Sequence, residues 1–223
     1  MMKSRRAQMK SILTILVLAL AFPTVASAFE APRGLRWGTP WDSVIVDIRK
    51  LPREKQFLPD KPKKHKHLPT GFTGSKIKKI KLLKEKADEA YLIFDSTDGL
   101  CAVQYAFIWD NVENPDNMFD SPGKGRAKAW EYAQKLVYAL KSKYGDPESD
   151  QINDHLGEKL TSGLQFSAKW LDQESGNSII AVVTRKYTNA VIAKIDRYAV
   201  VLQYSTPNYI EEVKKEAIDV DEL

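Results

Sequence analysis

The chain has 223 residues, a formal net charge of +5 and 43% hydrophobic residues. This hydrophobic content excludes an intrinsically disordered protein, and a chain of this length can bury a core without disulfides. The one cysteine, Cys101, excludes an intramolecular disulfide. We expect a globular protein, and one domain is the natural count.

The first 28 residues have the three parts of a cleavable export signal. A basic segment without acidic residues comes first: Lys3, Arg5, Arg6 and Lys10. An apolar stretch then runs from Ile12 to Phe22, about half the length that a membrane-spanning helix needs. Ala26 and Ala28 have the small side chains that a signal peptidase accepts, which predicts cleavage before Phe29. We therefore expect an exported protein with one domain over residues 29–223.

Two features of this signal stay open. Translation starts at Met1 or at Met9. With Met1, the segment Ser4–Lys10 partly resembles a twin-arginine signal, but Gln8 stands where that signal has a large apolar residue. We favour the ordinary secretory route over twin-arginine export.

Charge is unevenly distributed along residues 29–223. Residues 49–86 contain 14 Lys or Arg against 3 Asp or Glu, a net charge of about +11. The signal holds four positive charges, so the mature chain has a net charge near +1 and the rest of it about −10. Such a separation can steer an anionic partner to one surface. It can also be a solvated loop balanced by an acidic body.

The first predicted element after the signal is a helix that begins at Pro40 and is closed by Pro52. Thr39 suits the N-cap, and Asp42 suits a capping-box position. Four residues at spacings of three and four predict its buried face: Trp41, Val44, Ile48 and Leu51.

Residues 52–71 are predicted to form a basic, proline-rich loop. Lys76–Leu83 mixes lysines with apolar residues, which suits the edge of a sheet. Ala90–Phe94 is a short apolar strand, and a turn leads from it into the strand Leu100–Trp109. Alternation in that strand predicts one inward face: Cys101, Val103, Tyr105, Phe107 and Trp109.

A second helix is predicted over Arg126–Tyr144, ended by the glycine and proline of Gly145–Pro147. Its predicted buried stripe comprises Trp130, Ala133, Val137, Leu140 and Tyr144. Three further strands are predicted over Leu164–Leu171, Ser178–Arg185 and Tyr198–Tyr204. A short helix, Ile210–Ile218, and an acidic tail at 219–223 end the chain.

The order helix, strand, strand, strand is thus repeated, which predicts an α+β fold. We expect a mainly antiparallel sheet of about six strands, built as two αβββ-like halves. Both principal helices should pack on one face of this sheet.

Short motifs recur in this pattern. Gly34-Leu35-Arg36-Trp37-Gly38 opens the mature chain, Tyr144-Gly145-Asp146-Pro147 ends the second helix, and strands with Trp170 and Tyr204 follow. In these features the chain resembles uncharacterised exported proteins of Gram-negative bacteria. The resemblance spans most of residues 29–223 and implies a periplasmic α+β domain. It implies no catalytic residue.

Candidate metal sites are weak. His65 and His67 can chelate a metal from an extended segment, but the surrounding lysines repel a cation; His155 is the only other histidine. Acidic residues crowd one loop: Asp110, Glu113, Asp116 and Asp120. Val112 and Pro115 stand where a helix-flanked calcium loop needs an oxygen ligand and a glycine, so only a looser oxygen site stays open.

Catalytic motifs are not apparent in the sequence. It contains no Gly-x-Ser-x-Gly segment, and Cys101 is expected to be a buried apolar residue rather than a nucleophile. A paired-carboxylate hydrolase stays open, because the separation of two carboxylates is decided by the fold. We assign no catalytic residue and expect no cofactor.

The leading hypothesis is a non-enzymatic binding domain that contacts an anionic partner, either an acidic protein face or envelope phosphate groups. The predicted contact residues are Lys61, Lys63, Lys64, Lys66, Lys76, Lys78, Lys79 and Lys81. Nucleic acid is not expected outside the cytoplasm, and few aromatic residues lie among these lysines to stack on bases. Two alternatives stay open, an exported hydrolase-type enzyme with an acidic cleft and a binder of a small apolar ligand. The oligomeric state stays open as well.

Overall fold

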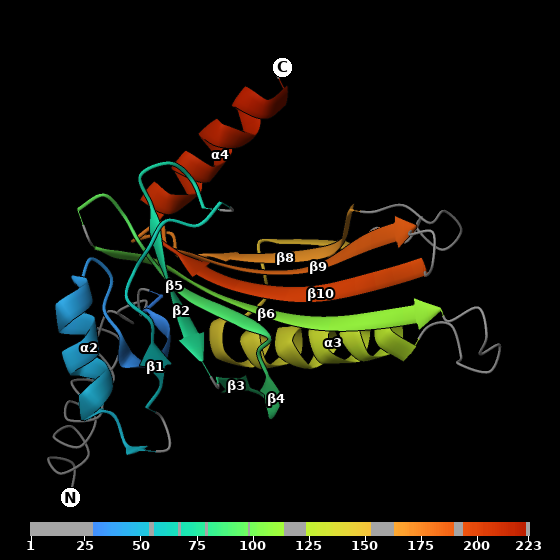
Figure 1. Cartoon of the computed structure of the whole chain (residues 1–223), viewed down its shortest axis with the longest axis horizontal. Coiled ribbons are helices and arrows are strands. Elements are labelled where there is room, and N and C mark those ends of the chain that lie inside the picture. The colour runs from blue at the N-terminus through green and yellow to red at the C-terminus, as the bar shows by residue number, and fades with distance from the viewer. Residues whose placement is uncertain are drawn as a thin grey trace, which may run out of the picture.

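An eight-stranded antiparallel sheet is the framework of the molecule (Figure 1). The computed structural model describes residues 29–53, 56–66, 68–78, 80–97, 99–113, 124–152, 163–189 and 194–221. The predicted signal lies outside these residues. The strand order is β1-β2-β5-β6-β10-β9-β8-β7, and β3 and β4 form a separate hairpin.

The strands and helices have these bounds. The strands of the large sheet are β1 (Leu58–Pro59), β2 (Thr73–Lys78), β5 (Glu89–Phe94), β6 (Leu100–Glu113), β7 (Ser149–Ile152), β8 (Gly163–Leu171), β9 (Ser178–Asn189) and β10 (Lys194–Ser205). The hairpin consists of β3 (Lys81–Leu82) and β4 (Glu85–Lys86). The helices are the 3-10 turn η1 (Pro32–Gly34), α2 (Trp41–Lys50), α3 (Lys124–Tyr144) and α4 (Pro207–Asp221).

Two αβββ halves meet at the centre of the sheet. In the first half, α2 is followed by β2, β5 and β6, and in the second, α3 is followed by β8, β9 and β10. The last strands of the halves, β6 and β10, pair over twelve residues, from Lys194 opposite Glu113 to Ser205 opposite Ala102. The predicted α+β fold with a mainly antiparallel sheet is confirmed.

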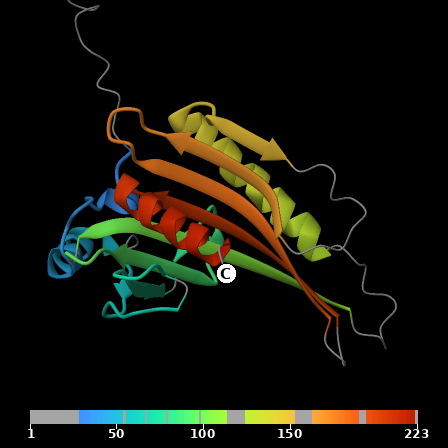
Figure 2. The ribbon, with the colours of Figure 1, turned by 90° about the horizontal axis from the view of Figure 1, so that it is seen from above.

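Both principal helices pack on one face of the sheet, as predicted. Val44 and Ile48 of α2 are buried in the same core as Ala133 and Leu140 of α3. The floor of this core consists of alternate residues of the central strands, which point to one side because strand side chains alternate. Figure 1 shows α3 along this face and α4 rising from the other, and Figure 2 shows α4 lying over the strands.

The glycine motifs have structural roles. Gly38 has a φ of +71° and donates its N–H to the carbonyl of Leu100 at 2.9 Å, so the opening motif joins the start of β6. Gly145 has a φ of +81° and donates to the carbonyl of Lys141 at 2.9 Å, which closes α3. The indole of Trp170 donates to the Gly145 carbonyl at 2.8 Å and ties this helix end to β8.

Helix details differ from the prediction in two places. Helix α2 begins at Trp41, and Pro40 rather than Thr39 is its N-cap, without a side-chain cap. The buried stripe of α3 is rotated by about one residue from the predicted one, because Trp130 and Val137 lie at the margin of the core. Its buried residues are Ala129, Tyr132, Ala133, Leu136 and Leu140.

The predicted edge strand Lys76–Leu83 was wrong in its bounds and its place. The chain forms β2 up to Lys78 and then β3 in a separate hairpin. Strand β2 is not the edge, because β1 and Lys63 pair with it. The segment that pairs with β2 contains prolines. Proline has no backbone N–H, but at the outer edge of a sheet this costs no hydrogen bond of the ladder.

Cys101 does not share the inward face of Val103. The register shifts between Ile93 and Phe94, which pair with Ala102 and Leu100 and leave Cys101 opposite no residue. This bulge turns Cys101 to the face on which α4 stands, so this part of the predicted alternation was wrong. Residues Val103, Tyr105 and Phe107 are buried on the predicted face.

The helices of the described part of the chain are too short or too polar to cross a membrane.

We predict that Leu202→Ala lowers the free energy of unfolding by about 2–5 kcal/mol, because Leu202 is fully buried at the centre of the sheet. Leu58→Ala is the matched control: Leu58 is 79% exposed, so its truncation should change stability by no more than about 0.5 kcal/mol. Urea unfolding of both variants measures the difference. Equal losses would contradict the assignment of β10 to the core.

Candidate partner-binding surface

The lysine-rich segment 60–66, here called the basic loop, is held against β2 by its backbone. Lys63 exchanges both backbone hydrogen bonds with Gly74, at 3.1 and 2.8 Å. The N–H of Asp60 donates to the carbonyl of Lys76 at 2.8 Å, and the Ser75 hydroxyl donates to the carbonyl of Asp60. The loop is therefore fixed at both ends of its run along the sheet.

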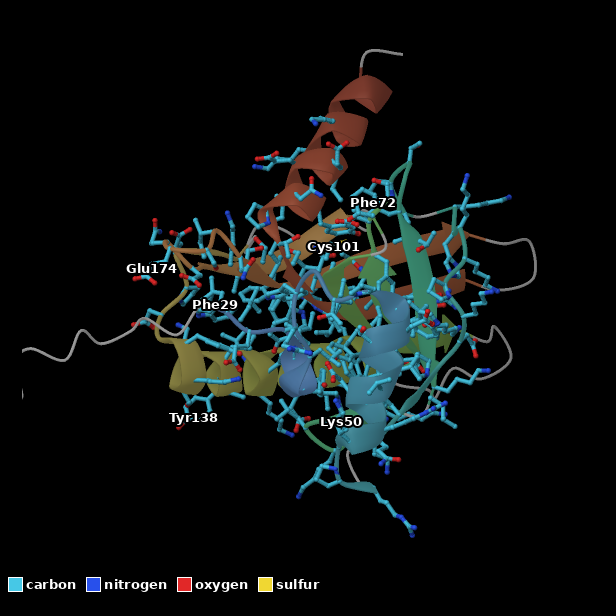
Figure 3. The ribbon with its side chains drawn as sticks, turned by 90° about the vertical axis from the view of Figure 1, so that its left-hand side faces the viewer. Phe29, Lys50, Phe72, Cys101, Tyr138 and Glu174 are labelled. Carbon is cyan, nitrogen blue, oxygen red and sulfur yellow. The ribbon has the colours of Figure 1, made fainter. Side chains whose placement is uncertain are left out.

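A small apolar cluster lies beneath the end of this loop. Leu68 and Phe72 are buried with Tyr91, Ile93 and Cys101, on the sheet face opposite α2 and α3. In Figure 3, Phe72 and Cys101 lie near the foot of α4. Tyr209 of α4 belongs to the same cluster, and its ring centre lies 5.3 Å from that of Phe72. The cluster therefore holds the chain after the loop against the base of α4.

His65 is used in packing. Its Nε2 lies 3.1 Å from the carbonyl oxygen of Gly74, and its ring is edge-on to that of Tyr91 at 5.1 Å. Gly74 leaves the space for this ring, because a Cβ there would be 2.9 Å from both His65 Cδ2 and Leu68 Cδ1. His67, the other residue of the considered metal-binding pair, and His155 lie outside the described residues.

Four lysines of the basic loop point outward: Lys61, Lys63, Lys64 and Lys66 are exposed. Asp60 is the one acidic residue between positions 56 and 84, and its carboxylate pairs with Lys78 at 2.9 Å. This hydrogen bond lowers the pKa of Asp60. In the described part of the chain, no carboxylate lies within 4 Å of the four ammonium groups of the loop.

The other predicted lysines are divided between the two faces. Lys76 is half-buried on β2, with its ammonium 6.0 Å from the centre of the Tyr91 ring, next to the basic loop. Lys81 is in the β3–β4 hairpin, which lies beside α3 because Tyr132 donates a hydrogen bond to the carbonyl of Leu82. The structure therefore does not bring Lys81 to the loop, and Lys79 lies outside the described residues.

Three central strands of the sheet carry a partly exposed apolar surface that the sequence patterns did not predict. We call this surface the open face; it consists of Gln104, Ala106 and Ile108 of β6, Ala199, Val201 and Gln203 of β10, and Ile180, Val182 and Thr184 of β9. The order β2-β5-β6 places β2 and β5 between the loop, which pairs with the outer side of β2, and the open face, and the exposed Glu89 of β5 stands opposite Ala106. The open face is thus mainly apolar, with Glu89 of β5 on one side and Lys169 of β8 on the other, and the basic loop lies two strands away from it.

Grooves of moderate size lie on the α3 side. One of about 260 Å³ is lined by Trp130, Val137, Tyr138 and Phe166. Another of about 280 Å³ lies between α3 and the β3–β4 hairpin and is lined by two carboxylates, Glu85 and Glu131, of which Glu131 is paired with Lys135 at 2.6 Å.

The predicted oxygen site is only partly described. Asp110 accepts two hydrogen bonds from the guanidinium of Arg197, at 2.6 and 2.9 Å, and these lower the pKa of its carboxyl. Asp116 and Asp120 lie outside the described residues. Over the described ranges, no group of three or more His, Cys, Asp or Glu side chains has the arrangement of a metal site.

Cys101 has the surroundings of a core residue. It is buried, and its Sγ lies 3.3 Å from the carbonyl oxygen of Ile93, to which the thiol donates. Burial raises the pKa of this thiol above its usual range. A protonated, enclosed thiol is a poor nucleophile.

Comparison with known proteins assigns no family to the chain: no family model, no curated protein and no solved structure matches it. The resemblance to exported proteins of Gram-negative bacteria therefore stays a prediction from the motifs.

We predict that Gly74→Ala lowers the free energy of unfolding by about 1–3 kcal/mol, because the added methyl group collides with His65 and Leu68. Hydrogen exchange of residues 60–72 should become faster in this variant, since those side chains hold the loop. Unchanged exchange in this segment would show that the loop does not depend on the contact.

A thiol reagent at pH 8 should modify Cys101 much more slowly in the folded protein than in urea, since the folded state both buries the thiol and raises its pKa. Reagent absorbance measures the two rates. Equal rates would contradict the burial of this side chain.

Proposed function

We propose that the protein is a non-enzymatic, periplasmic binding domain that contacts an anionic partner through its basic loop. The contact residues are Lys61, Lys63, Lys64 and Lys66, with Lys76 and Lys78 of β2 beside them. The observation that carries this proposal is the exposure of four like charges on a backbone that hydrogen bonds hold in place.

Stability does not account for this arrangement. Four ammonium groups within six residues repel one another, and the one carboxylate of the segment is used by Lys78. Exposed lysines without a partner add little to folding stability. An anionic surface brought against them would replace repulsion by attraction.

The anchored backbone favours binding. A loop that is ordered before it meets its partner loses less conformational entropy on association than a loop that must be ordered. The hydrogen bonds of Lys63 with Gly74 and of Asp60 with Lys76 provide this order. The loop therefore presents its charges in a fixed pattern.

The open face supports the same proposal. Protein interfaces combine an apolar centre with a polar or charged rim. Ile108, Val201 and Val182 supply partly exposed apolar side chains, and the basic loop lies two strands away from them, beyond β5 and β2. This combination favours an acidic protein face over envelope phosphates as the partner, and the experiment separates the two.

Replacing Lys61, Lys63, Lys64 and Lys66 together by Gln should weaken binding at low salt by at least about tenfold, since each lysine near an anionic surface contributes about 1 kcal/mol. Binding is measured by pull-down from native envelope extract, with identification of the partner, and by sedimentation with vesicles of anionic or zwitterionic lipid. Wild-type binding should fall steeply with ionic strength.

The matched control removes four lysines from α3, on the other side of the sheet: Lys128, Lys135, Lys141 and Lys143. This variant has the same net charge as the loop variant and should bind like wild type. Capture of an acidic protein but not of anionic vesicles would favour the protein partner. Equal binding by the wild type and the loop variant would refute the proposal.

A further inference from the structure

Phe29 occupies a site that several distant parts of the chain build around it. Its carbonyl oxygen accepts hydrogen bonds from the indole of Trp37 at 2.8 Å and from the side-chain amide of Asn177 at 3.2 Å. Its ring is edge-on to that of Tyr144 at 4.9 Å. Phe29 is thus held through both its backbone and its side chain, from the opening motif, the end of α3 and the β8–β9 turn.

The nitrogen of Phe29 points at a buried carboxylate. It lies 2.9 Å from Oδ2 of Asp172, a residue that is 6% exposed. The same carboxylate accepts the Ser175 hydroxyl at 2.6 Å and the N–H of Glu174 at 3.1 Å. Figure 3 shows Phe29 and Glu174 on the same side of the molecule.

Asp172 lacks a cationic side chain. The Ser175 hydrogen bond lowers the pKa of its carboxyl, so the group is ionised at neutral pH. Within the described residues, neither Lys nor Arg forms an ion pair with it. A buried charge is costly unless an opposite charge accompanies it, and the nitrogen of Phe29 is the group in place to supply one.

We propose that Asp172 is the receptor for the α-ammonium group of a mature chain that begins at Phe29. Hydrolysis of the Ala28–Phe29 peptide bond by a signal peptidase transfers the hydroxyl of water to the carbonyl carbon of Ala28 and a proton to the nitrogen of Phe29. The amine takes up a further proton at neutral pH. An amide N–H that donates to Asp172 then becomes an ammonium paired with it.

The geometry of the site is specific for an α-ammonium group at residue 29. Consecutive Cα atoms are about 3.8 Å apart, so cleavage one residue away would move the ammonium out of hydrogen-bond distance of Asp172. The bonds to the Phe29 carbonyl and the contact of its ring with Tyr144 fix the register. This inference rests on the predicted cleavage before Phe29 and is independent of the basic loop.

The pair links processing to stability. It joins the first mature residue to the turn between β8 and β9, while the ring of Phe29 holds the end of α3. With the signal attached, the same nitrogen is an uncharged amide and the ion pair does not exist. The mature protein is consequently more stable than its precursor, which suits a chain that must cross a membrane before it folds.

The experiment compares two chain starts in two backgrounds. One protein begins at Phe29, released from a fusion partner by a protease that leaves no extra residue. The other begins at Val25, so the Phe29 nitrogen is an amide and the α-ammonium is four residues away. Thermal unfolding should show the Phe29 form melting about 2–4 °C higher. Asp172→Asn, which keeps a hydrogen-bond acceptor but removes the charge, should abolish this difference.

Asp95→Asn is the matched control. Asp95 caps the turn between β5 and β6 in the same manner, accepting the N–H groups of Thr97 at 2.9 Å and Gly99 at 3.1 Å, but it does not contact Phe29. Its substitution should lower both melting temperatures alike and leave the difference between the two starts intact.

Two results would overturn the proposal. One is equal melting of the Phe29 and Val25 forms, and the other is a difference that persists in Asp172→Asn. Should that variant not fold, selective acetylation of the Phe29 amine, at a pH at which the lysines stay protonated, gives the same comparison, because it converts the ammonium to an uncharged amide. N-terminal sequencing of the protein recovered from its host should begin at Phe29, and any other start refutes the processing step.

Discussion

The pairing of β6 with β10 is the interaction on which the rest of the structure depends. Each strand is the last of its half, and their twelve-residue ladder joins two short meanders into one sheet. Because strand side chains alternate, this ladder divides the molecule into two faces. One face receives α2 and α3 and forms the large core, while the other carries the loop cluster, α4 and the open face. The large core contains residues of both halves, such as Val44 and Ile48 of the first and Ala133 and Leu140 of the second.

Much of this fold was predictable, because hydrophobic periodicity is a local property. Five of the six predicted strands (β5, β6, β8, β9 and β10), both principal helices and their common face followed from alternation and spacing. The errors came from long-range effects. A bulge opposite Ile93 and Phe94 turned Cys101 to the other face, and no local pattern announces it. The strand β7 was missed because its pairing with β8, rather than its own composition, makes it a strand.

The candidate surface was predictable in composition but not in arrangement. Counting charges identified the lysines, yet only the fold shows that Lys81 lies beside α3 while Lys63 lies along β2. The open face was overlooked because residues such as Ala106 and Val201 are brought together by the pairing of β6 with β10, which only the fold shows. Apolar residues at outward positions of neighbouring strands are the signal that would have found it. Asp172 has no sequence signal, because its partner is 143 positions away.

Several carboxylates of the described residues form ion pairs with a cation of the same chain, whereas the four clustered lysines of the basic loop do not, and this difference supports a functional role for the loop. Asp110 is held by Arg197, Asp47 by Arg36 and Lys50, and Asp60 by Lys78. In each case a carboxylate has its cation within the same chain. In the described part of the chain, the four lysines of the basic loop form no ion pair within 4 Å, although the rest of the mature sequence carries an excess of about ten negative charges. The mature chain has many carboxylates that could have formed ion pairs with these lysines. A loop that only covers the edge of β2 needs its prolines and backbone hydrogen bonds, but it does not need several charges of the same sign. Four unpaired cations on an ordered backbone are therefore better explained by an anion that comes from another molecule.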